Sequence, residues 1–175
     1  MHVLLSISGK DRAGIVRDVA ESLLNIQANI EDSSMTALRG RFTMMLIVHI
    51  QADDISELKA TLAALEQRTD LTVQSQVLPE DEASQLCQEP DCVITVSGAD
   101  QAGIVHAVTD VLANMGVSIV DVSTQIRSND TGDMYMMALE VVSQGQSEAL
   151  TQRLQDTARQ LAVEIQLHDL SSDIL

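Results

Sequence analysis

The chain has 175 residues, of which 45% are hydrophobic and 1% aromatic, and it carries a formal net charge of −16 at pH 7. This composition predicts a folded protein, but its two aromatic rings, Phe42 and Tyr135, are too few for a platform that stacks single-stranded nucleic acid bases. The acidity also argues against direct duplex binding, which depends on Lys and Arg neutralising phosphates, and we interpret it as a solubility feature.

The first half of the chain predicts a β-α-β-β-α-β order of elements. The expected elements are a strand over 2–8, a helix from 15 that fades near 25, strands over 29–38 and 42–50, a helix over 55–68 and a strand over 71–78. Gly40 suits a tight hairpin between the second and third strands. Asp53 or Asp54 is the expected N-cap of the second helix.

The second half repeats this order, with a longer hairpin, "SNDTG". Its expected elements are a strand over 91–97, a helix over 101–115, strands over 117–127 and 133–142, a helix over 147–161 and a strand over 163–170. Residues 79–90, which hold both prolines, predict an exposed linker between a domain over 1–78 and a domain over 91–170. The fold class is therefore α+β, with two ferredoxin-like domains in tandem. Each has a four-stranded antiparallel sheet with both helices on one face.

Cysteine, histidine and apolar runs give no sign of a metal, a cofactor or a membrane segment. Cys87 and Cys92 have neither redox-pair nor zinc-site spacing, and the four histidines show no ligand pattern. The apolar run over 3–7 lacks the basic segment of a signal peptide, and no apolar run approaches the roughly 20 residues of a membrane span. Two thiols suit a reducing compartment, so we expect a cytoplasmic protein without a membrane partner.

The loop between the first strand and the first helix occurs twice, as "SGKDRAGIV" and "SGADQAGIV". A helix N-terminus offers unpaired N–H groups and the positive end of the helix dipole to a carboxylate. Asp11 and Asp100, at the predicted N-caps, offer an acceptor to an ammonium group, so the loop suits a free amino acid. Glycines there allow close approach of a ligand or another backbone: Gly9 and Gly14, then Gly98 and Gly103. The alternative is ordinary capping and turn chemistry, worth about 1 kcal/mol of helix stability.

Three other features have mainly structural interpretations. Five methionines lie in the two third strands, two in the first half and three in the second, and alternation divides them between core and surface. They suit the core better than a partner surface: Met44, Met45, Met134, Met136 and Met137. Arg39 and Arg41 suit a solvated turn better than an anion site. His106 lacks an evident orienting carboxylate, so no catalytic residue is expected.

The combination of "DRAGIV" or "DQAGIV" after the first strand, "ANI" or "VSI" at the start of the second strand and the βαββαβ order resembles the ACT domain, a regulatory module that commonly senses amino acids. Two such units at this length resemble the glycine cleavage system transcriptional repressor group of tandem ACT proteins. The resemblance implies a ligand site where two domains meet. It would be formed by the first strand–helix loop of one domain and the start of the second strand of its neighbour.

The resemblance carries over to particular positions. It implies that Asp11 contacts the ligand, that Gly14 ends the loop, and that Asn29, followed by Ile30, supplies a side-chain amide. Ser118 and Ile119 stand at these strand positions in the second half. Because Ser118 is shorter, the second site is expected to bind differently or not at all. The favoured site combines Asp11 or Asp100 with Asn29.

The function implied by the resemblance is non-catalytic. A homo-oligomer would bind a small amino acid, with glycine as the candidate, and repress the glycine cleavage operon by contacting a DNA-binding activator. An ACT-type module that regulates another enzyme or pathway is the alternative. An acyl phosphatase on the same fold would need Arg12, but its counterpart is Gln101 and the adjacent Asp11 would repel phosphate.

Overall fold

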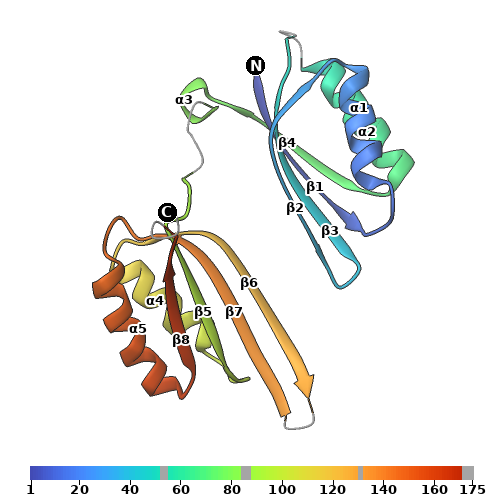
Figure 1. Cartoon of the computed structure of the whole chain (residues 1–175). Helices are drawn as coiled ribbons and strands as arrows, with labels where there is room; N and C mark the ends of the chain where they lie inside the picture. Colours follow the sequence, from blue (N-terminus) through green and yellow to red (C-terminus); the bar gives the residue numbers. More distant parts are fainter. Residues whose placement is uncertain (52–54, 84–87, 130–131, 171–175) are drawn as a thin grey trace. The chain divides into compact units, whose positions relative to one another are not determined.

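The computed structural model describes residues 1–51, 55–83, 88–129 and 132–170. The chain divides into two compact units, Met1–Gln85 and Leu86–Leu175, called domain 1 and domain 2 below (Figure 1).

Domain 1 contains a four-stranded antiparallel sheet in the order β2-β3-β1-β4. Figure 1 shows both of its long helices on one side of this sheet. Its elements are β1 (His2–Lys10), α1 (Ile15–Asn25), β2 (Asn29–Leu38), β3 (Arg41–His49), α2 (Ser56–Thr69), β4 (Thr72–Leu78) and the one-turn α3 (Glu80–Ala83).

Domain 2 repeats the arrangement, with the strand order β6-β7-β5-β8. Its elements are β5 (Cys92–Ala99), α4 (Ile104–Asn114), β6 (Ser118–Asn129), β7 (Gly132–Val142), α5 (Ser147–Leu161) and β8 (Glu164–Asp169). The predicted fold class, two ferredoxin-like units with helices on one face of each sheet, is confirmed.

The core of each domain lies between the sheet and its helices. In β1 the side chains of Val3, Leu5 and Ile7 are fully buried while the residues between them are partly exposed, as the two-residue period of a strand requires. On α1 the buried apolar residues recur every four positions, at Ile15, Val19 and Leu23. Among the described residues of each domain, both long helices lie on this one face of the sheet, and the opposite face is called the open face below.

Strands β2 and β6 each form one edge of their sheet. Every residue of β2 is exposed, and both strands carry a β-bulge near their starts, between Ile30 and Asp32 and between Ile119 and Asp121. Bulges at sheet edges bend the strand locally and redirect its side chains. The two domains thus share the same irregularity at the same position.

Several boundaries differ from the sequence-based expectation. Helix α4 begins at Ile104, later than the predicted 101, because Gly103 has a positive φ of 99° that a right-handed helix does not accept. The predicted linker contains the short helix α3. Asp53, Asp54 and Cys87, and the tip of the second hairpin at 130–131, lie outside the described residues.

Candidate functional site

The β1–α1 loop of domain 1 differs from the prediction in its capping. The N-cap residue is Gly14, with φ 87°, and within the described chain no side chain caps α1. The interpretation of Asp11 and Asp100 as N-caps is therefore wrong: a left-handed glycine, Gly14 or Gly103, follows three residues later and starts each helix. Asp11 instead donates its backbone N–H to the Gly40 carbonyl at 2.9 Å, which ties the loop to the β2–β3 hairpin.

A cavity of about 120 Å³ lies beside this loop. It is lined by Asp11, Arg12, Gly14, Ile15, Val16, Arg17, Met35 and Phe42. The residues after the N-cap, Ile15 to Arg17, are the ones whose backbone N–H groups have no acceptor inside the helix. The cavity thus brings together a carboxylate, two guanidinium groups and the positive end of a helix.

Basic residues gather at this end of domain 1. Five of the ten lysines and arginines of the chain lie at the end of β1, in the loop, in the first turn of α1 or at the β2–β3 hairpin: Lys10, Arg12, Arg17, Arg39 and Arg41. Lys10 pairs with Arg41 in the β1–β3 register, so the two segments share one end of the sheet. The hairpin arginines and Arg12 lie too far apart in the sequence for their gathering to be predicted from local pattern, and it follows from the strand register.

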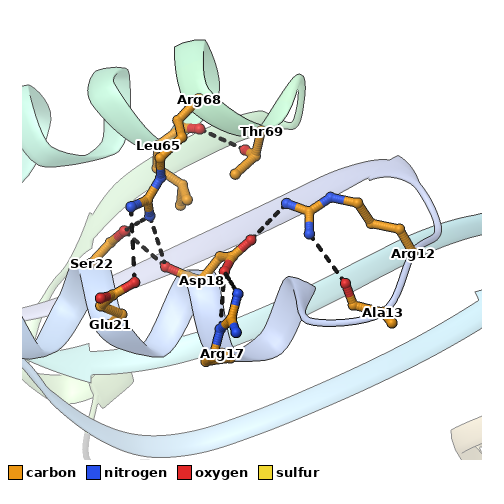
Figure 2. A network of polar contacts seen from close by, with 9 residues as sticks. All are labelled: Arg12, Ala13, Arg17, Asp18, Glu21, Ser22, Leu65, Arg68 and Thr69. Atoms are coloured by element: carbon orange, nitrogen blue, oxygen red, sulfur yellow. Dashed lines mark hydrogen bonds and ion pairs between the residues drawn. The ribbon is translucent and has the colours of Figure 1, made fainter.

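Asp18 holds Arg12 of the loop and Arg17 of the first turn of α1 in place (Figure 2). Its carboxylate, on a residue only 8% exposed, accepts a hydrogen bond from Arg12 at 2.6 Å and another from Arg17 at 2.9 Å. These bonds, that from Arg12 first, lower the pKa of Asp18 below its ordinary value, and Asp18 in turn raises the pKa of Arg17. The loop is therefore anchored to α1 by charge-assisted hydrogen bonds.

The same network reaches the second helix of domain 1. Ser22 donates its hydroxyl to the Asp18 carbonyl at 2.9 Å and accepts a hydrogen bond from Arg68 of α2 at 3.2 Å. Figure 2 shows Arg68 between this hydroxyl and the Glu21 carboxylate, 3.9 Å from its guanidinium. A chain of polar contacts thus links the loop, α1 and α2.

Gly9 and Gly98 serve the packing of the domain itself. A Cβ on Gly9 would lie 2.5 Å from Cδ2 of Leu71, and one on Gly98 would lie 2.7 Å from Cγ1 of Val163. Each glycine therefore makes room for the residue that precedes the last strand of its domain. At these two positions the close neighbour is the protein's own side chain.

The loop of domain 2 has different chemistry. Gln101 stands where domain 1 has Arg12, and its amide donates to the Leu161 carbonyl at 2.5 Å. Ala107 stands where domain 1 has Asp18. Tyr135, which pairs with Gly98 as Phe42 pairs with Gly9, is buried, and its pKa is raised by burial and by the nearby charge of Asp100.

The predicted strand residues lie far from the loop of their own domain. Asn29 pairs with His49, whereas Lys10, next to Asp11, pairs with Arg41 at the other end of β3. Eight residues of strand separate these ends, about 26 Å at 3.3 Å per residue. Ser118 is likewise at the β6 end remote from Asp100, so neither domain brings its own two predicted groups together.

The methionines divide between the core and the surface. Met44 and Met137 are buried, as predicted for the core, whereas Met45, Met134 and Met136 are exposed. His106 is exposed beside a groove of about 410 Å³ between α4 and β6 that Ile119 also lines. The described residues contain no group of three or more His, Cys, Asp or Glu side chains arranged to hold a metal ion. Within them, every helix is too short or too polar to cross a membrane.

Comparison with solved structures finds the whole tandem arrangement elsewhere. An unknown protein from Galdieria sulphuraria is 27% identical and has a TM-score of 0.78, with 97% of this chain and 98% of that chain covered. A protein proposed to be a glycine cleavage system transcriptional repressor is 20% identical and has a TM-score of 0.72, with 95% of each chain covered. Because the sequence identity is 20%, the similarity to this second protein is evidence for a shared fold.

Curated relatives correspond to one domain. The UPF0237 protein YjhC of Lactococcus lactis is 38% identical over 63 residues, which are 36% of this chain and 72% of the relative. The UPF0237 protein DIP1286 of Corynebacterium diphtheriae is 32% identical over 78 residues, which are 43% of this chain and 88% of the relative. The ACT domain family profile matches residues 1–76 and again 91–168. This chain therefore belongs to the ACT domain family and carries two copies of the domain in tandem.

Proposed function

We propose that the chain is a non-catalytic transcriptional regulator that binds a small amino acid, with glycine as the candidate. It represses the glycine cleavage system operon, when glycine is scarce, by contacting a DNA-binding activator protein in the cytoplasm. The observation that carries the ligand part of this proposal is the cavity beside the β1–α1 loop of domain 1, where Asp11 lies beside two arginines and a helix N-terminus.

This cavity suits the charges of a zwitterion. The guanidinium groups of Arg12 and Arg17 and the helix N-terminus attract a carboxylate, and the Asp11 carboxylate attracts an ammonium group. Its volume of about 120 Å³ is small beside the hollows of about 320 to 410 Å³ elsewhere on the described residues, which favours a small ligand. Glycine fits both requirements.

Domain 1 is the proposed sensing domain. In domain 2, Gln101 stands at the position of Arg12 and His106 at the position of Arg17. The second site therefore offers less positive charge to a carboxylate. Gly14 and Gly103 start the two helices in the same way, which leaves the side chains as the main difference. Asp100 and Gly103 remain candidates for a weaker second site, whereas Gly98 makes room for Val163.

Asn29 and Ile30 would complete the site from a second copy of the chain. Antiparallel pairing of two exposed β2 edges would place the start of one strand beside the hairpin end of the other, which is the end that holds the β1–α1 loop. Such a homo-oligomer would bring Asn29 of one chain to Asp11 of its partner. Ser118 and Ile119 occupy the corresponding places on β6.

The regulatory step is a proposal about a partner protein. The strong negative charge of the chain is suited to a basic partner such as a DNA-binding protein and unsuited to DNA itself. The structural likeness to the proposed glycine cleavage repressor supports the same assignment at the level of the fold. Glycine would act by binding the activator-bound and free states with different affinities.

Calorimetric titration with the amino acids tests the ligand. We expect heat with glycine, its loss in Asp11→Ala, its reduction in Asn29→Ala, and its persistence in Asp100→Ala as the matched control. No heat with any amino acid would remove the sensing function, and selective heat with another amino acid would favour regulation of a different pathway. Capture of a candidate activator with and without glycine, together with a gel shift of operator DNA by the chain alone, tests the partner.

A further inference from the structure

The open faces of the two sheets carry almost the same row of side chains. In domain 1 the strand register places Gln74, Ser6, Met45 and Ser34 side by side across β4, β1, β3 and β2. In domain 2 the equivalent row across β8, β5, β7 and β6 is Gln166, Thr95, Ala138 and Ser123. The row differs substantially at one position, where domain 1 has a methionine and domain 2 an alanine.

This exchange places a long side chain in the middle of the domain 1 row and a short one within a hollow of the domain 2 face, while domain 1 has a hollow of about 320 Å³ beside Ser6 and Gln74. Met45 is 50% exposed in the middle of its row. The open face of domain 2 has a hollow of about 360 Å³ that spans all four strands and includes Ala138, Thr95, Ser123 and Gln166 in its lining. Methionine is flexible and polarisable, which suits insertion into an irregular apolar and hydroxyl-lined space.

The charges at the ends of the two faces are also complementary. Lys10 and Arg41 are neighbours across β1 and β3 at one end of the domain 1 face. Asp121 and Glu140 are neighbours across β6 and β7 at one end of the domain 2 face. All four residues are exposed, so a domain 1 face can meet a domain 2 face with opposite charges together.

We propose that the open face of domain 1 in one chain packs against the open face of domain 2 in a second copy of the chain, with Met45 seated in the hollow at Ala138. A two-fold axis repeats the contact, so that each chain contributes one face of each kind and the dimer is closed. This contact uses the sheet faces and is separate from the β2 edges.

The area of the faces favours this double contact. Four strands spaced about 4.8 Å apart and about seven residues long cover about 440 Å². One pair of faces then buries about 900 Å², below the range of stable interfaces, whereas two pairs bury about 1,800 Å², which is a standard size. A dimer with two pairs of faces therefore reaches the buried area of a stable interface, which a single pair of faces does not.

Cross-linking of mixed chains tests the position of the contact. Met45→Cys and Ala138→Cys are prepared in separate chains, each in a Cys87→Ser background, because the remaining Cys92 is buried. Packed sheets lie about 10 Å apart, so a short bismaleimide is the suitable reagent. We expect a covalent dimer from the mixture of both variants and little from either variant alone. A mixture without a covalent dimer would overturn the proposal, as would a double variant that forms only cross-linked monomer.

Sedimentation measures the contribution of Met45 to assembly. Met45→Glu places a charge where the hollow of the partner would receive an apolar side chain, so we expect a lower weight-average molar mass than that of the wild type. Leu24→Glu is the matched control, since Leu24 is 71% exposed on α1, in the helical layer on the other side of the sheet. An unchanged mass for Met45→Glu, or an equal loss with Leu24→Glu, would contradict the proposed contact.

Discussion

The two domains share a backbone and differ in the chemistry of the same loop. In domain 1 the loop is held by the ion pair from Arg12 to Asp18 of α1, while in domain 2 an amide hydrogen bond from Gln101 to Leu161 links it to the end of α5. The left-handed glycine that starts the first helix is present in both. Both domains therefore keep the glycine turn at the start of the first helix, whereas the arginine side chains beside that turn are present in domain 1 alone among the described residues.

The largest effect is expected from adding a methyl group to the close-packed glycine in the first strand of each domain. Gly98→Ala should lower the free energy of unfolding of domain 2 by about 2–3 kcal/mol, because its Cβ would meet Cγ1, Cβ and Cα of Val163 within 3.3 Å. Gly9→Ala should cost domain 1 about 1 kcal/mol, since the closest atom is the movable end of Leu71.

Hydrogen exchange followed by mass spectrometry measures both changes, because peptides report each domain separately. Gly145→Ala offers a control that strains a turn without a close contact, since no atom lies within 4 Å of a Cβ at Gly145. An equal loss in Gly9→Ala and Gly98→Ala would show that the side chain of Leu71 cannot yield.

The next effect concerns the loop charge. Arg12→Gln gives domain 1 the residue of domain 2 and should weaken glycine binding about tenfold, as expected for the loss of one charge-assisted hydrogen bond. Calorimetry measures the Kd. Arg159→Gln is the control, because Arg159 also pairs with an aspartate, Asp156, but lies on α5. The same Kd in wild type and Arg12→Gln would remove Arg12 from the site.

A smaller effect distinguishes the domains by their acid sensitivity. Hydrogen bonds from Arg12 and Arg17 lower the pKa of Asp18. Burial raises the pKa of Asp91, but the hydrogen bonds that Asp91 accepts from Ser143 outweigh burial, so the net shift of its pKa is downward. Because both folded pKa values lie below the ordinary 3.8, each carboxylate stabilises its domain above that pH. That stability is lost as the pH falls through the folded pKa.

Urea unfolding between pH 7 and pH 2 measures this loss. We expect Asp18→Asn to make the stability of domain 1 less dependent on pH, and Asp91→Asn to do the same for domain 2. The fluorescence of the single tyrosine, Tyr135, reports the unfolding of domain 2. An acid dependence of domain 2 that Asp91→Asn leaves unchanged would assign it to other carboxylates.

The smallest effect is expected at Tyr135, which occupies the place of Phe42. Within the described residues, the hydrogen-bond partner of the buried Tyr135 hydroxyl is the sulfur of Met137, at 3.6 Å. Tyr135→Phe should therefore change the free energy of unfolding by less than about 0.5 kcal/mol, measured by circular dichroism in urea. A loss above about 1 kcal/mol would reveal a stronger role for the hydroxyl than this contact provides.

Much of the fold followed from local pattern. The alternation of Val3, Leu5 and Ile7 and the four-residue spacing of Ile15, Val19 and Leu23 were sufficient to predict a strand followed by a helix. The start of α4 and the capping were less predictable. The sequence shows which residue types are present near a turn, but the φ of Gly14 or Gly103 depends on how the strand enters the helix.

The sequence by itself determined the duplication, the order of the elements and the acidic composition, because these depend on neighbouring residues and on counting. Tertiary structure decided that five basic residues share one end of domain 1, that Asn29 and Asp11 lie at opposite ends of their sheet, and that Met45 and Ala138 occupy equivalent places on two open faces. Such relations follow from strand register, and register joins residues that are distant in the chain.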